Sequence, residues 1–87
     1  MKGFWKSVYI LRCNDGTFYT GCTEDMQVRL ERHRSSYVEY TRKRLPVELI
    51  FHCSFISKQK AFEFEKYLKT GSGIAFRNKH FISTDAG

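Results

Sequence analysis

The stretch SVYILRCNDGTFYTGCT, residues 7–23, decides the fold because it predicts two strands joined by a tight turn. The first predicted strand begins two residues before this stretch, extends from Trp5 to Cys13 and is rich in valine, isoleucine, leucine and tyrosine. The second predicted strand runs from Phe18 to Cys22, and the turn residues Asn14-Asp15-Gly16 lie close before it. Two such runs around a glycine-containing turn are typical of a β-hairpin.

The length of the hairpin loop determines where the two tyrosines point. A type I turn closed by Gly16 in the left-handed region makes a three-residue loop, which pairs Leu11 with Tyr19. Tyr9 and Tyr19 then share one face of the sheet. A two-residue loop at Asp15-Gly16 would place them on opposite faces. The Asn-Asp-Gly sequence favours the three-residue loop.

The remaining chain predicts three helical segments and one more strand. We expect a helix capped by Thr23 and running through about Arg34, then a loop over Ser35 to Pro46 and a strand from Val47 to Ser54. A second helix is capped by Ser57 and runs from Lys58 to about Thr70, where Gly71-Ser72-Gly73 makes a break. A short helical turn from Ile74 to His80 and a frayed tail from about Ser83 complete the chain. The order β-β-α-β-α-α predicts a single α+β domain over residues 1–87, with a small, three-stranded, mostly antiparallel sheet flanked by helices.

Composition predicts the class of protein and the cellular compartment. With 87 residues, 41% of them hydrophobic, the chain suits one globular domain. It has no apolar run near the roughly 20 residues that span a bilayer, so we expect a cytoplasmic protein that does not enter a membrane. Three cysteines without a CxxC pair favour buried free thiols in a reducing compartment.

Positive charge is concentrated in the middle of the chain. The net charge is +6, and residues 29–44 hold six basic residues against two acidic ones. This segment also carries Tyr37 and Tyr40, and cations with aromatic faces favour a nucleic-acid partner. The expected nucleic-acid-binding residues are Arg32, Arg34, Arg42, Lys43, Arg44 and Lys69. The alternative is a solvated helix face followed by a loop.

Two predicted helices carry polar residues on faces that should be apolar. At 100° per residue, Glu65 lies inside the apolar arc of its helix, where a carboxylate needs a cation, a hydrogen bond or an ion pair. A bridge to a nearby lysine or arginine is the simpler alternative to a metal. Arg29 and His33, four residues apart, share a face of the earlier helix and suit phosphate binding and proton transfer.

Taken together, these residues resemble a known nuclease family. Ser7-Val8-Tyr9, then Tyr19-Thr20-Gly21, then Arg29 with His33, Glu65 and Asn78 resemble the GIY-YIG nuclease domain, over about Ser7 to Phe81. The chain is similar to the small stand-alone members related to the N-terminal nuclease domain of the excinuclease C subunit. Ser7, Val8 and Thr20 depart from the family triplets, but both tyrosines are kept.

The resemblance implies a metal-dependent endonuclease acting on nucleic acid, in the first place DNA. Tyr9 would be the general base, although an ordinary phenol pKa near 10 needs help from cationic neighbours. Tyr19 would orient phosphate or water, Arg29 would stabilise charge, and His33 would assist Tyr9. Glu65 would hold one Mg²⁺ or Mn²⁺, and Asn78 would hold a phosphate or an outer water.

Alternatives to this activity are a non-catalytic nucleic-acid-binding module with the same fold and, more distantly, a protein-interaction adaptor. A zinc site or a cysteine hydrolase is disfavoured because no ligand pair has a metal-site spacing and neither explains Arg29 or Glu65. Repair, recombination and defence against foreign DNA all suit the resemblance. A homodimer or a protein partner would be one source of specificity, because 87 residues leave little room for a sequence-reading element.

Overall fold

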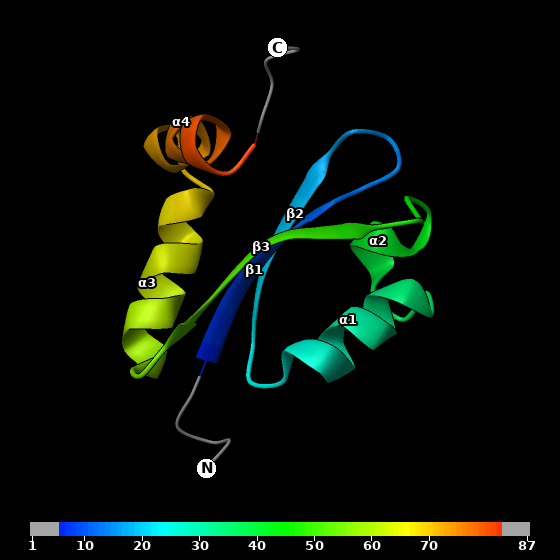
Figure 1. Ribbon diagram of the computed structural model, residues 1–87, viewed down its shortest axis with the longest axis horizontal. Coiled ribbons are helices and arrows are strands. Elements are labelled where there is room, and N and C mark those ends of the chain that lie inside the picture. The colour runs from blue at the N-terminus through cyan, green and yellow to red at the C-terminus, as the bar shows by residue number, and fades with distance from the viewer. Residues whose placement is uncertain (1–5, 83–87) are drawn as a thin grey trace.

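A three-stranded sheet with helices on both of its faces forms the body of the protein (Figure 1). The computed structural model describes residues 6–82. Along the chain the elements are β1 (Lys6–Arg12), β2 (Phe18–Thr23), α1 (Met26–Arg34), α2 (Glu39–Arg42), β3 (Glu48–Phe55), α3 (Lys58–Leu68) and α4 (Gly71–His80). The predicted α+β class is confirmed. The proposed strand start at Trp5 and the tail from Ser83 lie outside the described residues.

The hairpin between β1 and β2 has the predicted three-residue loop. The amide of Cys13 donates to the carbonyl of Thr17 at 2.8 Å, and Gly16 has a φ of 86°. Because the left-handed conformation suits glycine, the loop closes without strain at this position. Leu11 therefore pairs with Tyr19 as predicted.

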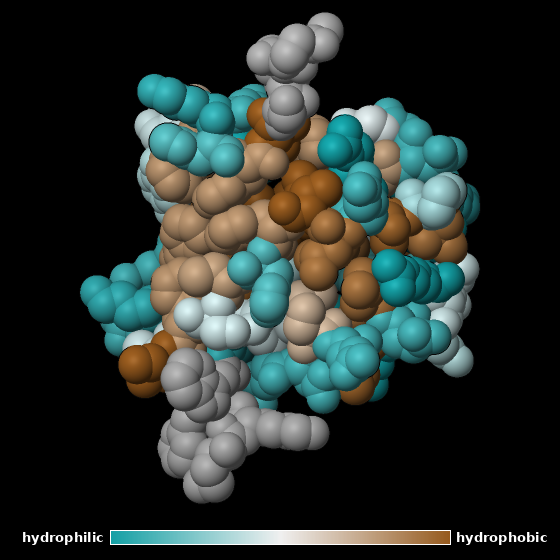
Figure 2. All heavy atoms as spheres, in the orientation of Figure 1, coloured by the Kyte–Doolittle hydropathy of each residue, from teal (hydrophilic) through white to brown (hydrophobic). Residues whose placement is uncertain are grey.

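The sheet has two buried faces, which follow the alternation of side chains along β1. The strand order is β2-β1-β3, with both pairings antiparallel, so β2 has a free edge. Val8 and Ile10 pack with Ala61 and Leu68 beneath α3 and α4. The other face, beneath α1 and α2, holds Tyr9, Leu11, Cys13 and Val47. In Figure 2, hydrophobic residues gather across the middle of the visible face, and hydrophilic residues lie mostly toward its margins.

Three local predictions about helices were wrong. Thr23 belongs to β2, and the cap of α1 is Asp25, whose carboxylate accepts from the amide of Val28 at 3.1 Å. The segment predicted as a loop contains the short helix α2. Gly71-Ser72-Gly73 is the first turn of α4 and not a break, because the Thr70 hydroxyl accepts from the amide of Gly73 and caps the helix.

Gly73 is needed for space rather than for flexibility. A Cβ atom at this position would collide with the carbonyl of Tyr67, at the point where α3 gives way to α4. A glycine there lets the two helices meet closely.

The three cysteines differ in their burial. All three cysteines are free, but only Cys13 is buried, whereas Cys22 is half-buried and Cys53 is exposed. The expectation of buried thiols is therefore wrong for Cys53.

Over residues 6–82, the helices are too short and too polar for any of them to cross a membrane.

Candidate active site

A buried chain of hydrogen bonds connects β1, α1 and α2. The Tyr9 hydroxyl lies 2.9 Å from Nε2 of His33, and Nδ1 of His33 lies 2.8 Å from the Thr41 hydroxyl. The Thr41 hydroxyl donates in turn to the carbonyl of Val38 at 3.5 Å. With a hydrogen on Nδ1 of His33, every one of these groups is satisfied, and Tyr9 donates to Nε2.

Burial determines the charge of the Tyr9 and His33 rings in this chain of hydrogen bonds. Tyr9 and His33 are each 0% exposed. Burial, assisted by Tyr19, raises the pKa of Tyr9, and Arg29 acts in the opposite direction. Burial and the charge of Arg29 together lower the pKa of His33 to about 4. His33 is therefore neutral at pH 7, and its Nε2 can accept a hydrogen bond from the Tyr9 hydroxyl.

Gly21 makes room for the phenol of Tyr9. The two residues pair across β1 and β2, and a Cβ atom on Gly21 would lie 2.5 Å from the Tyr9 hydroxyl oxygen. The ring of Tyr9 therefore lies directly over the backbone of β2. This explains why a glycine follows Tyr19 by two positions.

Tyr19 joins this cluster on the same face, as the hairpin predicted. Its ring centroid lies 6.1 Å from that of Tyr9 and 5.0 Å from that of His33. Its other neighbour is Tyr40 of α2, at 5.4 Å. Unlike Tyr9, Tyr19 is half-buried and lines an open pocket.

Arg29 lies where the buried cluster meets the surface. It influences the pKa values of Tyr9 and His33, so its guanidinium is close to both. With Arg32 and Tyr37 it also lines a groove of about 720 Å³. Arg29 is thus placed to face both the tyrosines and a ligand in this groove.

Glu65 approaches from the opposite face of the sheet. Its side chain is 18% exposed and forms an ion pair of 3.0 Å with Nζ of Lys69, the simple bridge that the sequence left open. Glu65 and Arg29 act in opposite directions on the pKa of Cys22, which burial raises. Charges from both α1 and α3 therefore act on Cys22 of β2.

The donor set suits a hard cation and not zinc. Within residues 6–82, no group of three or more His, Cys, Asp or Glu side chains could hold a metal. Glu65 supplies one carboxylate in a half-buried position. A single carboxylate completed by waters fits Mg²⁺ or Mn²⁺, which retain several waters when bound to proteins.

The structure does not bring every predicted residue into this cluster. Asn78 is exposed, and its amide oxygen accepts from the guanidinium of Arg77 at 3.0 and 3.2 Å. No contact in the described part of the chain joins Asn78 to Tyr9 or Glu65. Asn78 is therefore connected to the site only through Arg77.

The predicted nucleic-acid-binding residues also differ in their surroundings. Arg32, Arg34, Arg42, Lys43 and Lys69 are exposed. Arg44 is different, because its guanidinium donates to the Asp15 carboxylate and to the carbonyl of Tyr40.

Sequence reasoning missed Thr41 and the close fit of Gly21. Thr41 is fully buried as the partner of His33, but it lies in a segment without helical or strand periodicity. The close fit of Gly21 could have been predicted, because the three-residue loop pairs Tyr9 with Gly21.

Comparison with known proteins agrees with this geometry. The model of the GIY-YIG catalytic domain matches residues 6–77. The chain belongs to the GIY-YIG family. The match ends one residue before Asn78, so it does not extend to that position. Membership supports a nuclease-type function, because this family is defined by a catalytic domain.

Relatives in bacteria share most of the domain. A UPF0213 protein of Streptococcus agalactiae serotype V is 46% identical over 63 residues, which are 71% of this chain and 72% of the relative. A UPF0213 protein of Staphylococcus epidermidis is 39% identical over 64 residues, 72% of this chain and 78% of the relative. The solution NMR structure of UPF0213 protein BH0048 from Bacillus halodurans has a TM-score of 0.56 and 35% identity, and the likeness covers 86% of this chain and 83% of that one. These likenesses extend the family assignment to a solved structure of a small relative.

Proposed function

We propose that this GIY-YIG protein is an endonuclease that hydrolyses phosphodiester bonds in DNA with the help of one divalent cation. The observation that carries the proposal is the meeting of Tyr9, Tyr19, Arg29 and His33 in one cluster beside the free edge of β2. Glu65 reaches the same strand from the other face. This combination of phenols, a guanidinium, a neutral imidazole and a carboxylate suits phosphoryl chemistry.

Each residue has a role that follows from its surroundings. Glu65 would hold Mg²⁺ or Mn²⁺, which when bound polarises the phosphate as a Lewis acid. Arg29 neutralises charge that develops on the nonbridging oxygens. His33 is neutral, and its hydrogen bond to the Tyr9 hydroxyl holds that phenol in position. Asn78 would contact a phosphate or an outer water beside Arg77, its hydrogen-bond partner.

The two tyrosines compete for the role of general base. Tyr9 is connected to a proton acceptor but is fully buried, whereas Tyr19 is half-buried and lines the open pocket. We assign the base to Tyr9, with Arg29 as the cation that favours its ionised form, and the positioning of water or phosphate to Tyr19. Burial of Tyr9 is the observation that favours a second candidate function, a nucleic-acid-binding module without cleavage.

Cleavage assays on plasmid and branched DNA separate the two functions. We expect wild-type cleavage with Mg²⁺ or Mn²⁺ and none with EDTA. Glu65→Gln should abolish cleavage, because a neutral amide replaces the carboxylate at nearly the same size. Glu63→Gln is the matched control, since Glu63 is an exposed carboxylate on the same helix, paired with Gln59.

Two results would contradict the proposal. Cleavage by Glu65→Gln at the wild-type rate would remove Glu65 from the site. Nucleic-acid binding without cleavage under any divalent cation would favour the binding module. Thermal melting of both variants checks that the fold is intact, and an RNA strand of the same sequence tests the preference for DNA.

A further inference from the structure

A second pocket lies at the free edge of β2, next to the tyrosine cluster. Its volume is about 320 Å³, within the range of small-molecule sites. It is lined by aromatic rings, an aliphatic side chain and two cations, contributed mainly by Phe18, Tyr19, Tyr40, Ile74, Lys69 and Arg77. Tyr19 therefore belongs both to the buried cluster and to this pocket.

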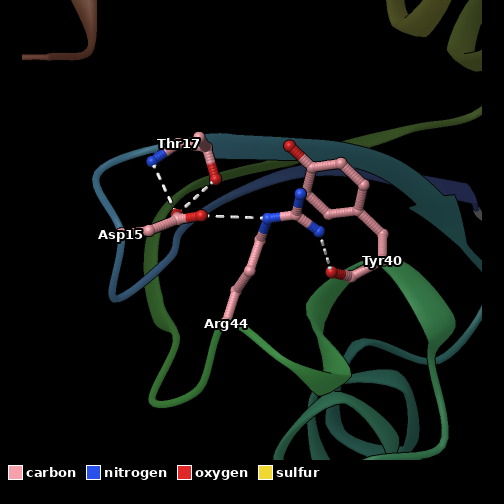
Figure 3. Close-up of polar contacts among 4 residues, drawn as sticks. All are labelled: Asp15, Thr17, Tyr40 and Arg44. Atoms are coloured by element: carbon pink, nitrogen blue, oxygen red, sulfur yellow. Dashed lines mark hydrogen bonds and ion pairs between the residues drawn. The ribbon is translucent and has the colours of Figure 1, made fainter.

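Arg44 holds the Tyr40 ring, which lines the pocket, in place. The guanidinium carbon of Arg44 lies 4.1 Å from the centroid of the Tyr40 ring, and Nη1 of Arg44 donates to the Tyr40 carbonyl at 2.6 Å. Nε of Arg44 donates to the Asp15 carboxylate at 3.0 Å, and Thr17 donates to the same carboxylate through its amide and its hydroxyl (Figure 3). The hairpin loop thus fixes an aromatic ring of α2 against Tyr19.

The opposite side of the pocket presents a guanidinium without an acidic partner. Arg77 stacks over the Phe18 ring at 4.6 Å and donates to the neutral amide of Asn78. No carboxylate among residues 6–82 forms an ion pair with Arg77. Its burial is sufficient to lower its pKa. A half-buried cation of this kind suits an anionic ligand, in particular a phosphate, which arginine binds in a bidentate manner.

Aromatic rings beside an uncompensated guanidinium match the two parts of a nucleotide. We propose that this pocket binds one unpaired nucleotide of the substrate strand, with its base against Tyr40 and Tyr19 and its phosphate at Arg77. A base inside a duplex is already paired and stacked, so it must leave the helix to enter. The proposal rests on the proposed function and adds a preference for single strands, flaps or bubbles.

Binding of a fluorescent base tests this pocket without any cleavage. The probe is a thymidine oligonucleotide with one 2-aminopurine, whose fluorescence falls when it stacks on an aromatic ring. In EDTA, we expect wild-type protein to quench the single strand but not the same strand in a duplex. Tyr40→Ala should abolish quenching and weaken single-strand binding roughly tenfold, as loss of one stacking partner does.

Two further variants keep the test decisive if Tyr40→Ala folds poorly. Ile74→Glu places a carboxylate on the exposed rim of the pocket, where it repels the phosphate, and should also abolish quenching, although no aromatic ring is removed or added. Tyr67→Ala is the matched control, because Tyr67 is 39% exposed, close to the 37% of Tyr40, but lies outside the pocket. It should leave quenching unchanged.

The outcomes separate this inference from the proposed function. Wild-type quenching by Tyr40→Ala and Ile74→Glu in an active nuclease would overturn the inference alone. Equal losses with Tyr67→Ala, or equal quenching of the duplex, would also overturn it. Quenching by a wild-type protein that cleaves nothing would support the pocket and contradict the nuclease.

Discussion

Acid should destabilise this protein through the single buried imidazole of His33. In the folded chain the pKa of His33 is about 4, whereas an ordinary histidine titrates near 6.5. The unfolded chain therefore binds a proton in this interval that the folded chain does not. Stability is fully present above pH 6.5 and is lost as pH falls toward 4. The gap corresponds to about 3 kcal/mol, a large part of the stability of a small domain.

Urea denaturation at several pH values measures this loss. Near pH 5 the free energy of unfolding should fall by about 1.4 kcal/mol for each unit of pH, the slope for one proton. His33→Gln should remove this part of the slope, although it is less stable at pH 7 because it disturbs the hydroxyls of Tyr9 and Thr41. Asp15, whose pKa is lowered from 3.8, contributes the same sign in a more acidic range.

An NMR titration of the wild-type protein provides a readout that does not depend on the variant. The ring signals of His33 should keep their neutral positions at pH 5, where an ordinary histidine is largely protonated. A midpoint near 6.5 for His33, or equal pH slopes for the wild type and His33→Gln, would refute the reasoning.

Three other variants, two single and one double, test the site and the basic segment. Gly21→Ala should lower the free energy of unfolding by about 1 to 3 kcal/mol and reduce cleavage, because its methyl group would meet the Tyr9 hydroxyl at 2.5 Å and that ring is buried. Unchanged melting and activity would contradict the close fit. Tyr9→Phe should bind nucleic acid but cleave at least about a hundredfold more slowly, as measured in single-turnover assays, and a loss below roughly tenfold would move the base to Tyr19. Charge reversal at the exposed Arg42 and Lys43 should leave melting nearly unchanged and reduce the slope of log K against log salt by roughly one for each lost contact, so an unchanged slope would mean a merely solvated surface.

The part of the site that sequence could predict is the part set by local rules. The turn chemistry of Asn14-Asp15-Gly16 fixed the register, and the register placed Tyr9 and Tyr19 together. Helical spacing placed Arg29 and His33 on one face of α1. Each of these conclusions needs only a few neighbouring residues and one known period.

The missing part depends on contacts between distant segments. Thr41 reaches His33, and Arg44 reaches Asp15, 29 residues away, from a segment that shows no periodic pattern. Positive charge alone made Arg44 look like a ligand for phosphate, because the sequence does not show that an aspartate in the hairpin loop meets it. The start of α4 was missed for a similar reason, since Gly73 is required by its approach to Tyr67 and not by a turn.

The edge position of β2 bears on the proposed site, which draws residues from both faces of the sheet. Tyr9 extends from the central strand β1 toward α1, whereas Glu65 belongs to α3 on the other face of the sheet. At a free edge there is no further strand in between, and side chains from both faces can meet around the backbone. Cys22 lies at this edge, where both Arg29 and Glu65 act on its pKa. A phosphate bound along β2 would therefore lie within reach of both helices, and the same edge leads directly into the pocket lined by Tyr19.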